Sequence, residues 1–123
     1  MADLIPFSPS RLDSSYFLRK FLKSQRKKIT KIIDIGCGKL YFYSILIEAG
    51  IAGYYLGIDL NPKYPREKIK LNAKITKIDF LKFKTTQKFD LAACLWVLEH
   101  IKKDLLALQK ISSFLKSGRE FIL

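Results

Sequence analysis

The chain has 123 residues, 49% of them hydrophobic, and carries a formal net charge of +12. This length suits a single domain, and the hydrophobic content is enough for a packed core, which argues against a disordered protein. No run of 18 apolar residues and no signal-peptide pattern is present, so we expect a basic cytoplasmic protein without a membrane span.

Helices and strands are expected to alternate along the chain. An extended opening at residues 4–10 is followed by a basic amphipathic helix from about residue 13 to 27. Alternation of this kind predicts a parallel sheet with helices on both faces. The other expected elements are strands at 31–35, 54–59, 73–78 and 89–96 and from 120 onward, helices at 40–49 and 99–115, and one or two helical turns within 63–70.

The positive charge is concentrated in two segments. Residues 1–31 carry eight basic and two acidic side chains, and residues 63–88 carry nine basic and two acidic ones. Basic surfaces attract polyanions. Segments 11–31 and 63–88 are therefore candidates for contact with RNA or DNA, and a lysine-rich surface without any partner is the alternative.

The cysteines and the single histidine do not indicate a metal site. Cys37 and Cys94 have neither metal-binding nor redox spacing, and His100 has no second histidine nearby. We expect both cysteines to be small buried hydrophobic residues.

The first expected strand ends in a glycine loop, Asp34-Ile35-Gly36-Cys37-Gly38. Ligands of such sheets bind beyond the carboxyl ends of the strands, and glycines let the backbone approach a ligand closely. Asp59 ends the second strand, where an acid can accept both ribose hydroxyls of an adenosine. Asp79 and Phe80 follow the third strand, where an acid and a ring can hold a purine by its amine and its face.

Two features argue against a nicotinamide dinucleotide. Its fingerprint requires a glycine at the position of Tyr41, and its pyrophosphate would be repelled by Asp34. A ligand with a sulfonium and an ammonium group, such as S-adenosylmethionine, fits Asp34 better on electrostatic grounds.

The run Ile33-Asp34-Ile35-Gly36-Cys37-Gly38 resembles motif I of the class I S-adenosylmethionine-dependent methyltransferases. The further matches are Leu56–Leu60 with the second motif, Asp79-Phe80 with the third, residues 89–100 with the fourth strand and the next helix, and Leu115–Arg119 with the turn before strand five. The resemblance covers roughly residues 29–123. It implies one Rossmann-like three-layer α/β domain over residues 1–123, with sheet order 3-2-1-4-5 and an N-terminal helix within residues 1–28.

The resemblance also implies S-adenosylmethionine as the cofactor and assigns a part of it to each motif. The glycine loop would line the methionine part, the acid after the second strand would hold the ribose, the third motif would lie at the adenine edge, and the fourth strand would close the site near the methyl group. The implied cofactor-binding residues are Asp34, Gly36, Cys37, Gly38, Asp59, Leu60, Asp79, Phe80, Leu95 and Trp96.

Each of these residues also has a purely structural interpretation. Asp59 and Asp79 can cap turns, and Leu60, Phe80 and Leu95 can be plain core. Glu99 and His100 are the only candidates for acid–base work, and they too can serve only as a helix start and as packing. Methyl transfer often requires only alignment of the reacting atoms.

The chain departs from the family pattern at two places. Leu40 stands where many members have a third glycine, so we expect it to crowd the helix start and to weaken binding or reshape the loop. The chain ends at Leu123, before the family's antiparallel strand pair, which predicts a fragment or a naturally short protein. Phe121-Ile122-Leu123 would then form an open edge through which chains could self-associate.

The sequence therefore predicts transfer of a methyl group from S-adenosylmethionine to an acceptor that it does not identify. No Asn-Pro-Pro-Tyr or Asp-Pro-Pro-Tyr follows the fourth strand, which argues against methylation of base amines. Leu40 and the missing last strands favour a second hypothesis, an inactive or partner-dependent cofactor-binding module. The basic segments favour a third, a nucleic-acid-binding domain.

Overall fold

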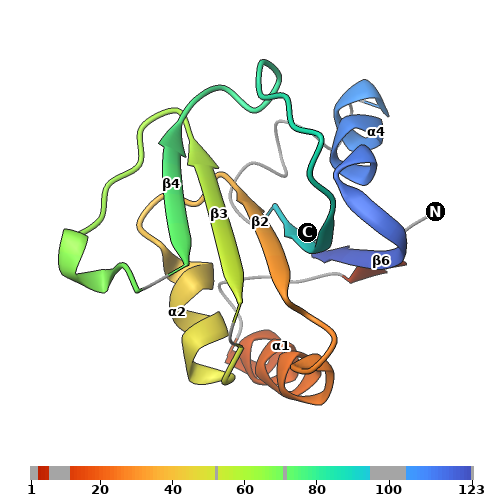
Figure 1. Cartoon of the computed structure of the whole chain (residues 1–123). Helices are drawn as coiled ribbons and strands as arrows, with labels where there is room; N and C mark the ends of the chain where they lie inside the picture. Colours follow the sequence, from red (N-terminus) through yellow and green to blue (C-terminus); the bar gives the residue numbers. More distant parts are fainter. Residues whose placement is uncertain (1–2, 6–11, 52, 71, 95–104, 123) are drawn as a thin grey trace.

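The computed structural model describes residues 3–5, 12–51, 53–70, 72–94 and 105–122 (Figure 1). Six strands form one sheet in the order β1-β6-β5-β2-β3-β4, and every neighbouring pair is parallel. The strands are β1 (Asp3–Ile5), β2 (Lys31–Ile35), β3 (Tyr54–Asp59), β4 (Ala73–Lys77), β5 (Phe89–Ala93) and β6 (Leu115–Ile122). The predicted order 3-2-1-4-5 corresponds to β4-β3-β2-β5-β6 and is confirmed.

Strand β1 was not predicted as part of the sheet. It pairs with the outer side of β6, in the register Asp3↔Glu120, Leu4↔Phe121 and Ile5↔Ile122. The expected open edge at Phe121 and Ile122 is therefore wrong, because the N-terminal residues satisfy the backbone groups of that edge. Self-association through this edge loses the basis on which it was predicted.

Helices cover both faces of the sheet. Helices α1 (Leu12–Gln25) and α2 (Tyr41–Glu48) lie on one face and α4 (Leu105–Ser113) lies on the other (Figure 1). A short 3-10 turn, η1 (Arg66–Lys68), is the one helical turn among the described residues of the segment that connects β3 to β4. The result is the three-layer α/β/α arrangement expected from the alternation of elements.

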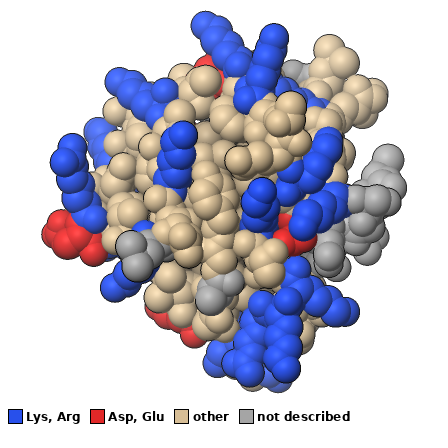
Figure 2. Space-filling view, viewed as in Figure 1, with Lys and Arg blue, Asp and Glu red and all other residues tan. Residues whose placement is uncertain are grey.

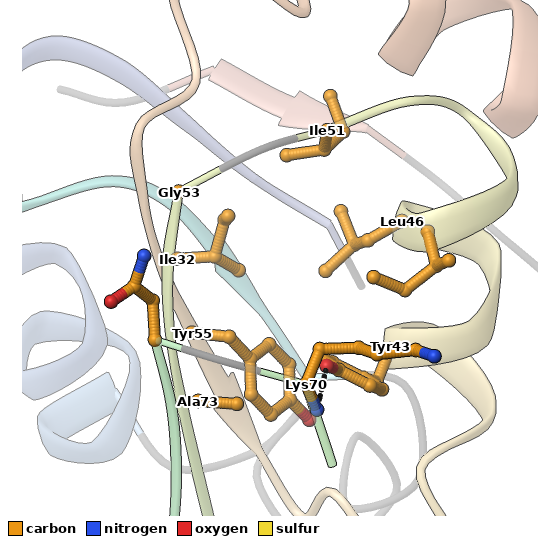
Figure 3. Close-up of a pocket in the computed structure, with 10 residues that line it drawn as sticks. Ile32, Tyr43, Leu46, Ile51, Gly53, Tyr55, Lys70 and Ala73 are labelled. Atoms are coloured by element: carbon orange, nitrogen blue, oxygen red, sulfur yellow. Dashed lines mark hydrogen bonds between the residues drawn. The ribbon is translucent and has the colours of Figure 1, made fainter. Parts of the chain in front are cut away.

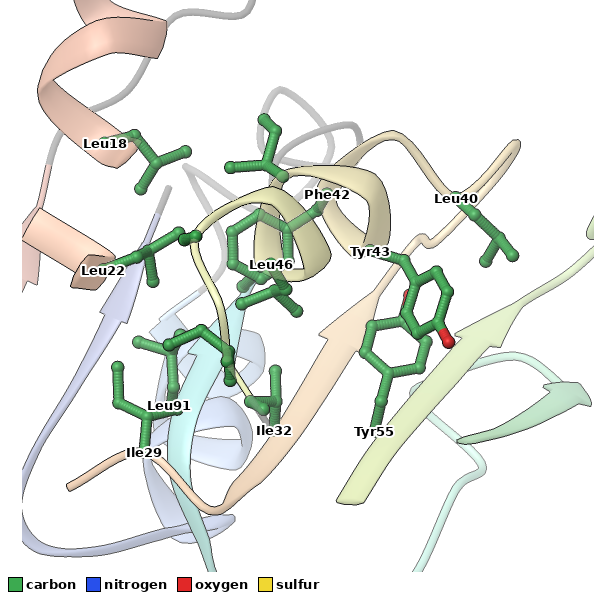
Figure 4. Close-up of a cluster of buried hydrophobic side chains, with 14 of the residues drawn as sticks. Leu18, Leu22, Ile29, Ile32, Leu40, Phe42, Tyr43, Leu46, Tyr55 and Leu91 are labelled. Carbon is green, nitrogen blue, oxygen red and sulfur yellow. The ribbon is translucent and has the colours of Figure 1, made fainter. Parts of the chain in front are cut away.

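Two hydrophobic clusters fill the spaces between the layers. The first joins α1 and α2 to the sheet through residues such as Leu18, Leu22, Phe42 and Leu46 (Figure 4). The second joins α4 to the opposite face through Ile111 and its neighbours. Strand β2 contributes alternate residues to the two faces, as a strand must: Ile32 faces the first cluster, and Ile33 and Ile35 face the second.

The connection between α4 and β6 differs from the prediction. Helix α4 ends at Ser113 and strand β6 already begins at Leu115, so the helix does not extend to the predicted Ser117-Gly118 break. Phe89 pairs with Leu115, but Leu91 pairs with Glu120, so β6 has extra residues at this point. The Ser-Gly pair thus lies in a bulged part of the strand, because a bulge accommodates residues that do not pair.

Asp90 ties β2, β5 and β6 together near the amino ends of β2 and β5. Its Oδ2 accepts hydrogen bonds from Thr30 N at 2.9 Å, Thr30 Oγ1 at 2.8 Å and Lys31 N at 2.9 Å. Lys116 Nζ lies 3.1 Å from Oδ1. Burial raises the pKa of Asp90, but these donors outweigh it and lower the pKa to about 2.

Candidate functional site

Five of the predicted site residues line one pocket where β2, β3 and β4 end: Gly36, Asp59, Leu60, Asp79 and Phe80. Because all three strands are parallel, their carboxyl ends lie at one edge of the sheet. A shallow pocket of about 100 Å³ at this edge is lined by Ile35, Gly36, Ile58, Asp59, Leu60, Ile78, Asp79 and Phe80. Sites for whole small ligands usually have roughly 300–1,000 Å³, so this pocket suits one part of a larger ligand.

The glycine loop is fixed to the neighbouring strand through its backbone. Gly36 N and Cys37 N both donate to Ile58 O, at 2.8 and 3.1 Å. Gly36 and Gly38 have φ of 75° and 51°, which side-chain-bearing residues rarely adopt. A Cβ at Gly38 would have Gly36 O as its nearest neighbour at 4.0 Å, so there is free space above the loop that a ligand can use.

Asp59 connects the end of β3 to the glycine loop. Its Oδ2 accepts a hydrogen bond from Gly38 N at 2.9 Å, and its Oδ1 accepts one from Asn61 N at 2.8 Å. The interpretation of Asp59 as a turn cap is thus confirmed. Each carboxylate oxygen has a second acceptor site, so the same side chain can also accept ribose hydroxyls. That second role stays a prediction.

The residues after β3 and β4 form the other walls of the pocket. Asp79 Oδ1 accepts a hydrogen bond from Leu81 N at 2.9 Å, so Asp79 also caps a turn. Phe80 is partly buried against the second cluster, and Lys110 Nζ lies 6.0 Å from its ring centre. Leu60 is 66% exposed. The alternative of plain core is therefore wrong for Leu60, which lies open at the pocket.

Asp34, the first residue of the glycine loop, is buried rather than exposed at its surface. It is 1% exposed, and its Oδ2 accepts a 2.5 Å hydrogen bond from Tyr55 Oη. Burial is the largest influence on this carboxyl and raises its pKa to about 7; the Tyr55 hydrogen bond opposes this, and the charge of Asp59 adds to it. A ligand above the loop would therefore experience the charge of Asp34 without touching the side chain.

Tyr55 is a residue of this region that the sequence analysis missed. The signal that could have revealed it is Gly57, which pairs with Asp34 in the sheet. A glycine inside a strand often marks a close approach of other groups. A Cβ at Gly57 would lie 3.0 Å from Cys37 Sγ and 3.0 Å from Tyr55 Cε1, so a larger residue would force the side chains packed here to shift.

Cys37 is buried within the glycine loop. Its side chain is 1% exposed and belongs to the first cluster, as expected for a small buried hydrophobic residue. Burial, together with the charges of Asp34 and Asp59, raises the pKa of its thiol to about 12. The thiol is therefore protonated and inert at neutral pH.

Leu40, which was expected to crowd the helix start, is the N-cap residue of α2 and packs its side chain into the core. It has φ 66° and ψ 34°, and its side chain is 0% exposed, in the first cluster (Figure 4). The left-handed conformation costs a non-glycine residue about 1–2 kcal/mol. Burying a leucine returns about 1.5–3 kcal/mol, which explains why leucine is tolerated at a glycine-like position.

A second pocket lies beside the glycine loop, between α2 and η1. It has about 530 Å³ and is lined by Gly38, Lys39, Tyr41, Ser44 and Lys68. Because Gly38 belongs both to this pocket and to the loop, the two sites adjoin. The two lysines make the pocket suitable for an anionic group.

Four predicted residues, Leu95, Trp96, Glu99 and His100, lie outside the described part of the chain. Within the part that is described, no cluster of three or more metal-ligating side chains occurs, and no helix is long and apolar enough to cross a membrane.

Comparison with known proteins gives one family and a shared fold. The model of a methyltransferase domain family matches residues 26–123. No curated protein matches the sequence.

Among solved structures, the chain is similar to the sugar N-methyltransferase KedS8 from Streptoalloteichus sp ATCC 53650, with 19% identity, a TM-score of 0.63 and coverage of 88% of this chain and 46% of that one. The plantazolicin methyltransferase BpumL in complex with SAH has 17% identity, a TM-score of 0.67 and coverage of 88% and 44%. SAM-bound CalS10, an amino pentose methyltransferase from Micromonospora echinaspora, has 18% identity, a TM-score of 0.61 and coverage of 89% and 49%. At these identities the likeness shows the fold, and the chain spans less than half the length of each of the three.

Proposed function

The chain belongs to the methyltransferase domain family, and from this premise we propose that it binds S-adenosylmethionine at the carboxyl end of its sheet and takes part in methyl transfer. The observation that carries the proposal is the convergence of Gly36, Asp59, Asp79 and Phe80 on one pocket beside a fixed glycine loop. When bound, this cofactor supplies an activated methyl group on a sulfonium.

The residues of the pocket fit the parts of this cofactor. The free acceptor sites of Asp59 would take the ribose hydroxyls, and Leu60 and Phe80 would contact the adenine ring. Asp79 would accept a hydrogen bond from the adenine amine. The backbone of Gly36, Cys37 and Gly38 would line the methionine part.

Three further sets of residues are proposed for the methionine part and the methyl end of the site. The buried charge of Asp34 would favour the cationic groups of the cofactor over a pyrophosphate. Leu95 and Trp96 would close the site near the methyl group, and Glu99 and His100 stay candidates for moving a proton from the acceptor.

The methyl acceptor is proposed to be anionic, with RNA or DNA as the partner class. The pocket with Lys39 and Lys68 adjoins the glycine loop, where an acceptor bearing phosphates could be held. Figure 2 shows Lys and Arg side chains over much of the viewed face, with a dense group over α1 and others along segment 63–88. Such a surface would bind nucleic acid with strong salt dependence.

A cytoplasmic location is part of the same proposal. Cys37 and Cys94 are both free and buried, which suits a reducing compartment.

The decisive variant for cofactor binding is Asp59→Ala. Losing hydrogen bonds to a charged group costs about 1.5–3 kcal/mol, so we expect calorimetry to show S-adenosylmethionine and S-adenosylhomocysteine bound roughly 10- to 100-fold more weakly. Glu48→Ala is the control, since Glu48 is an exposed acid on α2 that pairs with Arg19 and is not part of the pocket. Denaturation curves would verify that both variants are folded.

The possible outcomes separate the hypotheses. No binding by the wild type refutes the main proposal, and equal binding by wild type and Asp59→Ala refutes only the ribose assignment. Binding without methyl transfer to any acceptor pool would select the inactive or partner-dependent module. RNA binding that is absent, or equal at 50 and 200 mM salt, would refute the nucleic-acid partner.

A further inference from the structure

A buried pair of polar side chains lies at the start of the glycine loop. Tyr55 Oη on β3 donates a 2.5 Å hydrogen bond to Asp34 Oδ2 on β2. The two residues are 3% and 1% exposed, so water does not replace this bond. Among the residues that the structure describes, Tyr55 is the only one whose side chain hydrogen-bonds this carboxylate.

The groups around the pair carry no compensating positive charge. In the described part of the chain, neither Lys nor Arg forms an ion pair with Asp34. Burying an ionised carboxylate without a nearby cation is energetically unfavourable. Such a group therefore takes up a proton more readily, which means that its pKa is raised. The titratable groups that face the pair are Asp59 on β3, Cys37 in the loop, Cys94 after β5, and Tyr43 on α2, whose ring centre lies 4.8 Å from that of Tyr55.

We propose that Tyr55 is a positioning residue of the cofactor site. Its hydroxyl holds Asp34, at the start of the glycine loop, in the charged form that attracts a cationic ligand. This inference rests on the proposed function and goes beyond it, because Tyr55 lines neither of the two pockets beside the loop. A hydroxyl that donates to a carboxylate stabilises the charged form and not the protonated one.

The state of the two partners fits this role. The pKa of Asp34 lies at about 7, so a small change in its surroundings changes its charge at neutral pH. Burial and the charge of Asp34 raise the pKa of Tyr55 well above its ordinary value, so its hydroxyl keeps its proton and stays a donor. Ligand binding should therefore weaken on the acid side of the Asp34 titration.

Tyr43 offers a matched control. Its ring packs against that of Tyr55, but its hydroxyl accepts a hydrogen bond from Lys70 N at 2.9 Å instead of contacting Asp34 (Figure 3). Both tyrosine rings line a pocket of about 240 Å³ near the amino ends of β3 and β4, away from the glycine loop. Tyr43→Phe and Tyr55→Phe thus each remove one buried hydroxyl from the same cluster.

The experiment combines two pH titrations. Carbon-13 NMR of labelled aspartate carboxyls follows Asp34 in the free protein, with Asp34→Asn identifying its signal. Calorimetry follows S-adenosylhomocysteine, which keeps the ammonium group, from pH 5.5 to 9. We expect Tyr55→Phe to raise the Asp34 midpoint by about one pH unit, to weaken binding about fivefold at pH 7, and to approach the wild type at pH 9. Tyr43→Phe should leave the midpoint unchanged.

Two results would overturn the inference. One is an Asp34 midpoint that is the same in Tyr55→Phe and wild type. The other is a loss of affinity that is equal at every pH, since that is the mark of general structural damage. Failure of the wild type to bind at any pH would instead refute the proposed function, and the carbon-13 titration would still decide whether Tyr55 controls the charge of Asp34.

Discussion

Two buried aspartates lie toward opposite ends of the sheet, in opposite electrostatic settings. Asp90, near the amino end of β5, has three hydrogen bonds to one oxygen and Lys116 at the other, and its pKa is lowered to about 2. Asp34, near the carboxyl end of β2, has one hydroxyl partner, and burial raises its pKa to about 7. Both are at least 96% buried.

The difference shows that burial alone does not set the behaviour of a carboxylate; the number and charge of its partners do. At the amino end the partners outweigh the cost of burial, so Asp90 stabilises the fold. At the carboxyl end, the single hydrogen bond from Tyr55 compensates only a small part of the cost of burying Asp34. Groups with a strongly shifted pKa, such as Asp34, are concentrated at functional sites. There a ligand can supply the positive charge that the fold does not provide.

The largest expected effect is that of Asp90→Ala. The substitution leaves the donors of Thr30 and Lys31 without their acceptor, so we expect the free energy of unfolding to fall by about 4 kcal/mol in urea titrations at pH 7. Asp90→Asn keeps one acceptor oxygen and should lose about half as much. A loss below 1 kcal/mol for Asp90→Ala would show that Asp90 does not tie these strands together.

The pH dependence of this effect has a definite sign. The pKa of Asp90 is lower in the folded protein than its ordinary value of 3.8, so its contribution is present above pH 4 and is lost as the pH falls toward 2. The difference between wild type and Asp90→Ala should therefore be constant from pH 8 to 4 and shrink below that.

Asp34→Asn should raise the free energy of unfolding, whereas Asp90→Ala lowers it, and its effect should change over a different pH range. The folded pKa of Asp34 is raised from 3.8 to about 7, so the wild type is destabilised as the pH rises through this interval. Asparagine avoids that cost and can still accept the Tyr55 hydrogen bond, although its amide group needs a new partner. We expect Asp34→Asn to gain on the order of 3 kcal/mol relative to wild type between pH 4 and 8.

The measurement is urea unfolding of both proteins at one-unit pH steps, with Asp79→Asn as a control for removal of a partly exposed carboxylate beside the pocket. A difference between Asp34→Asn and wild type that does not change with pH would contradict the contrast between the two buried aspartates. In that case the pKa of Asp34 would be the same in the folded and the unfolded chain.

The sequence predicted the parts of the molecule that depend on local pattern. Periodicity and breakers located β2 and β3 at their observed bounds, and the glycine loop and Asp59 were placed at the correct edge of the sheet. The order of five strands followed from the family resemblance and is confirmed. These features follow from short segments or from a motif of fixed spacing.

The features that were missed depend on contacts between distant segments. Pairing of Asp3–Ile5 with β6 joins the two ends of the chain, and three residues are too few to give a strand pattern. The Tyr55–Asp34 bond joins residues 21 positions apart, and their meeting is decided by strand register and by the missing side chain of Gly57. The conformation of Leu40 was missed because burial overrode the backbone preference of leucine.

The smallest predicted effect is the difference in stability between Leu40→Gly and Leu40→Ala, which tests the backbone cost at this position. Leu40→Ala and Leu40→Gly both lose a buried side chain and should be less stable than wild type by about 2–5 kcal/mol. Glycine removes the cost of φ 66°, which alanine keeps, so Leu40→Gly should be more stable than Leu40→Ala by about 1 kcal/mol.

The same pair of substitutions at Ser44, inside α2, should have the opposite order, because glycine costs about 1 kcal/mol relative to alanine in a helix interior. If alanine is the more stable residue at both positions in urea unfolding, Leu40 carries no backbone cost. If glycine is the more stable residue only at position 40, then two unfavourable terms lie at the loop end of the sheet: the backbone conformation of Leu40 and the burial of the Asp34 carboxylate. Neither term is present at the Asp90 end. That pattern is expected of a fold whose carboxyl end is shaped for a ligand and whose amino end is shaped for stability.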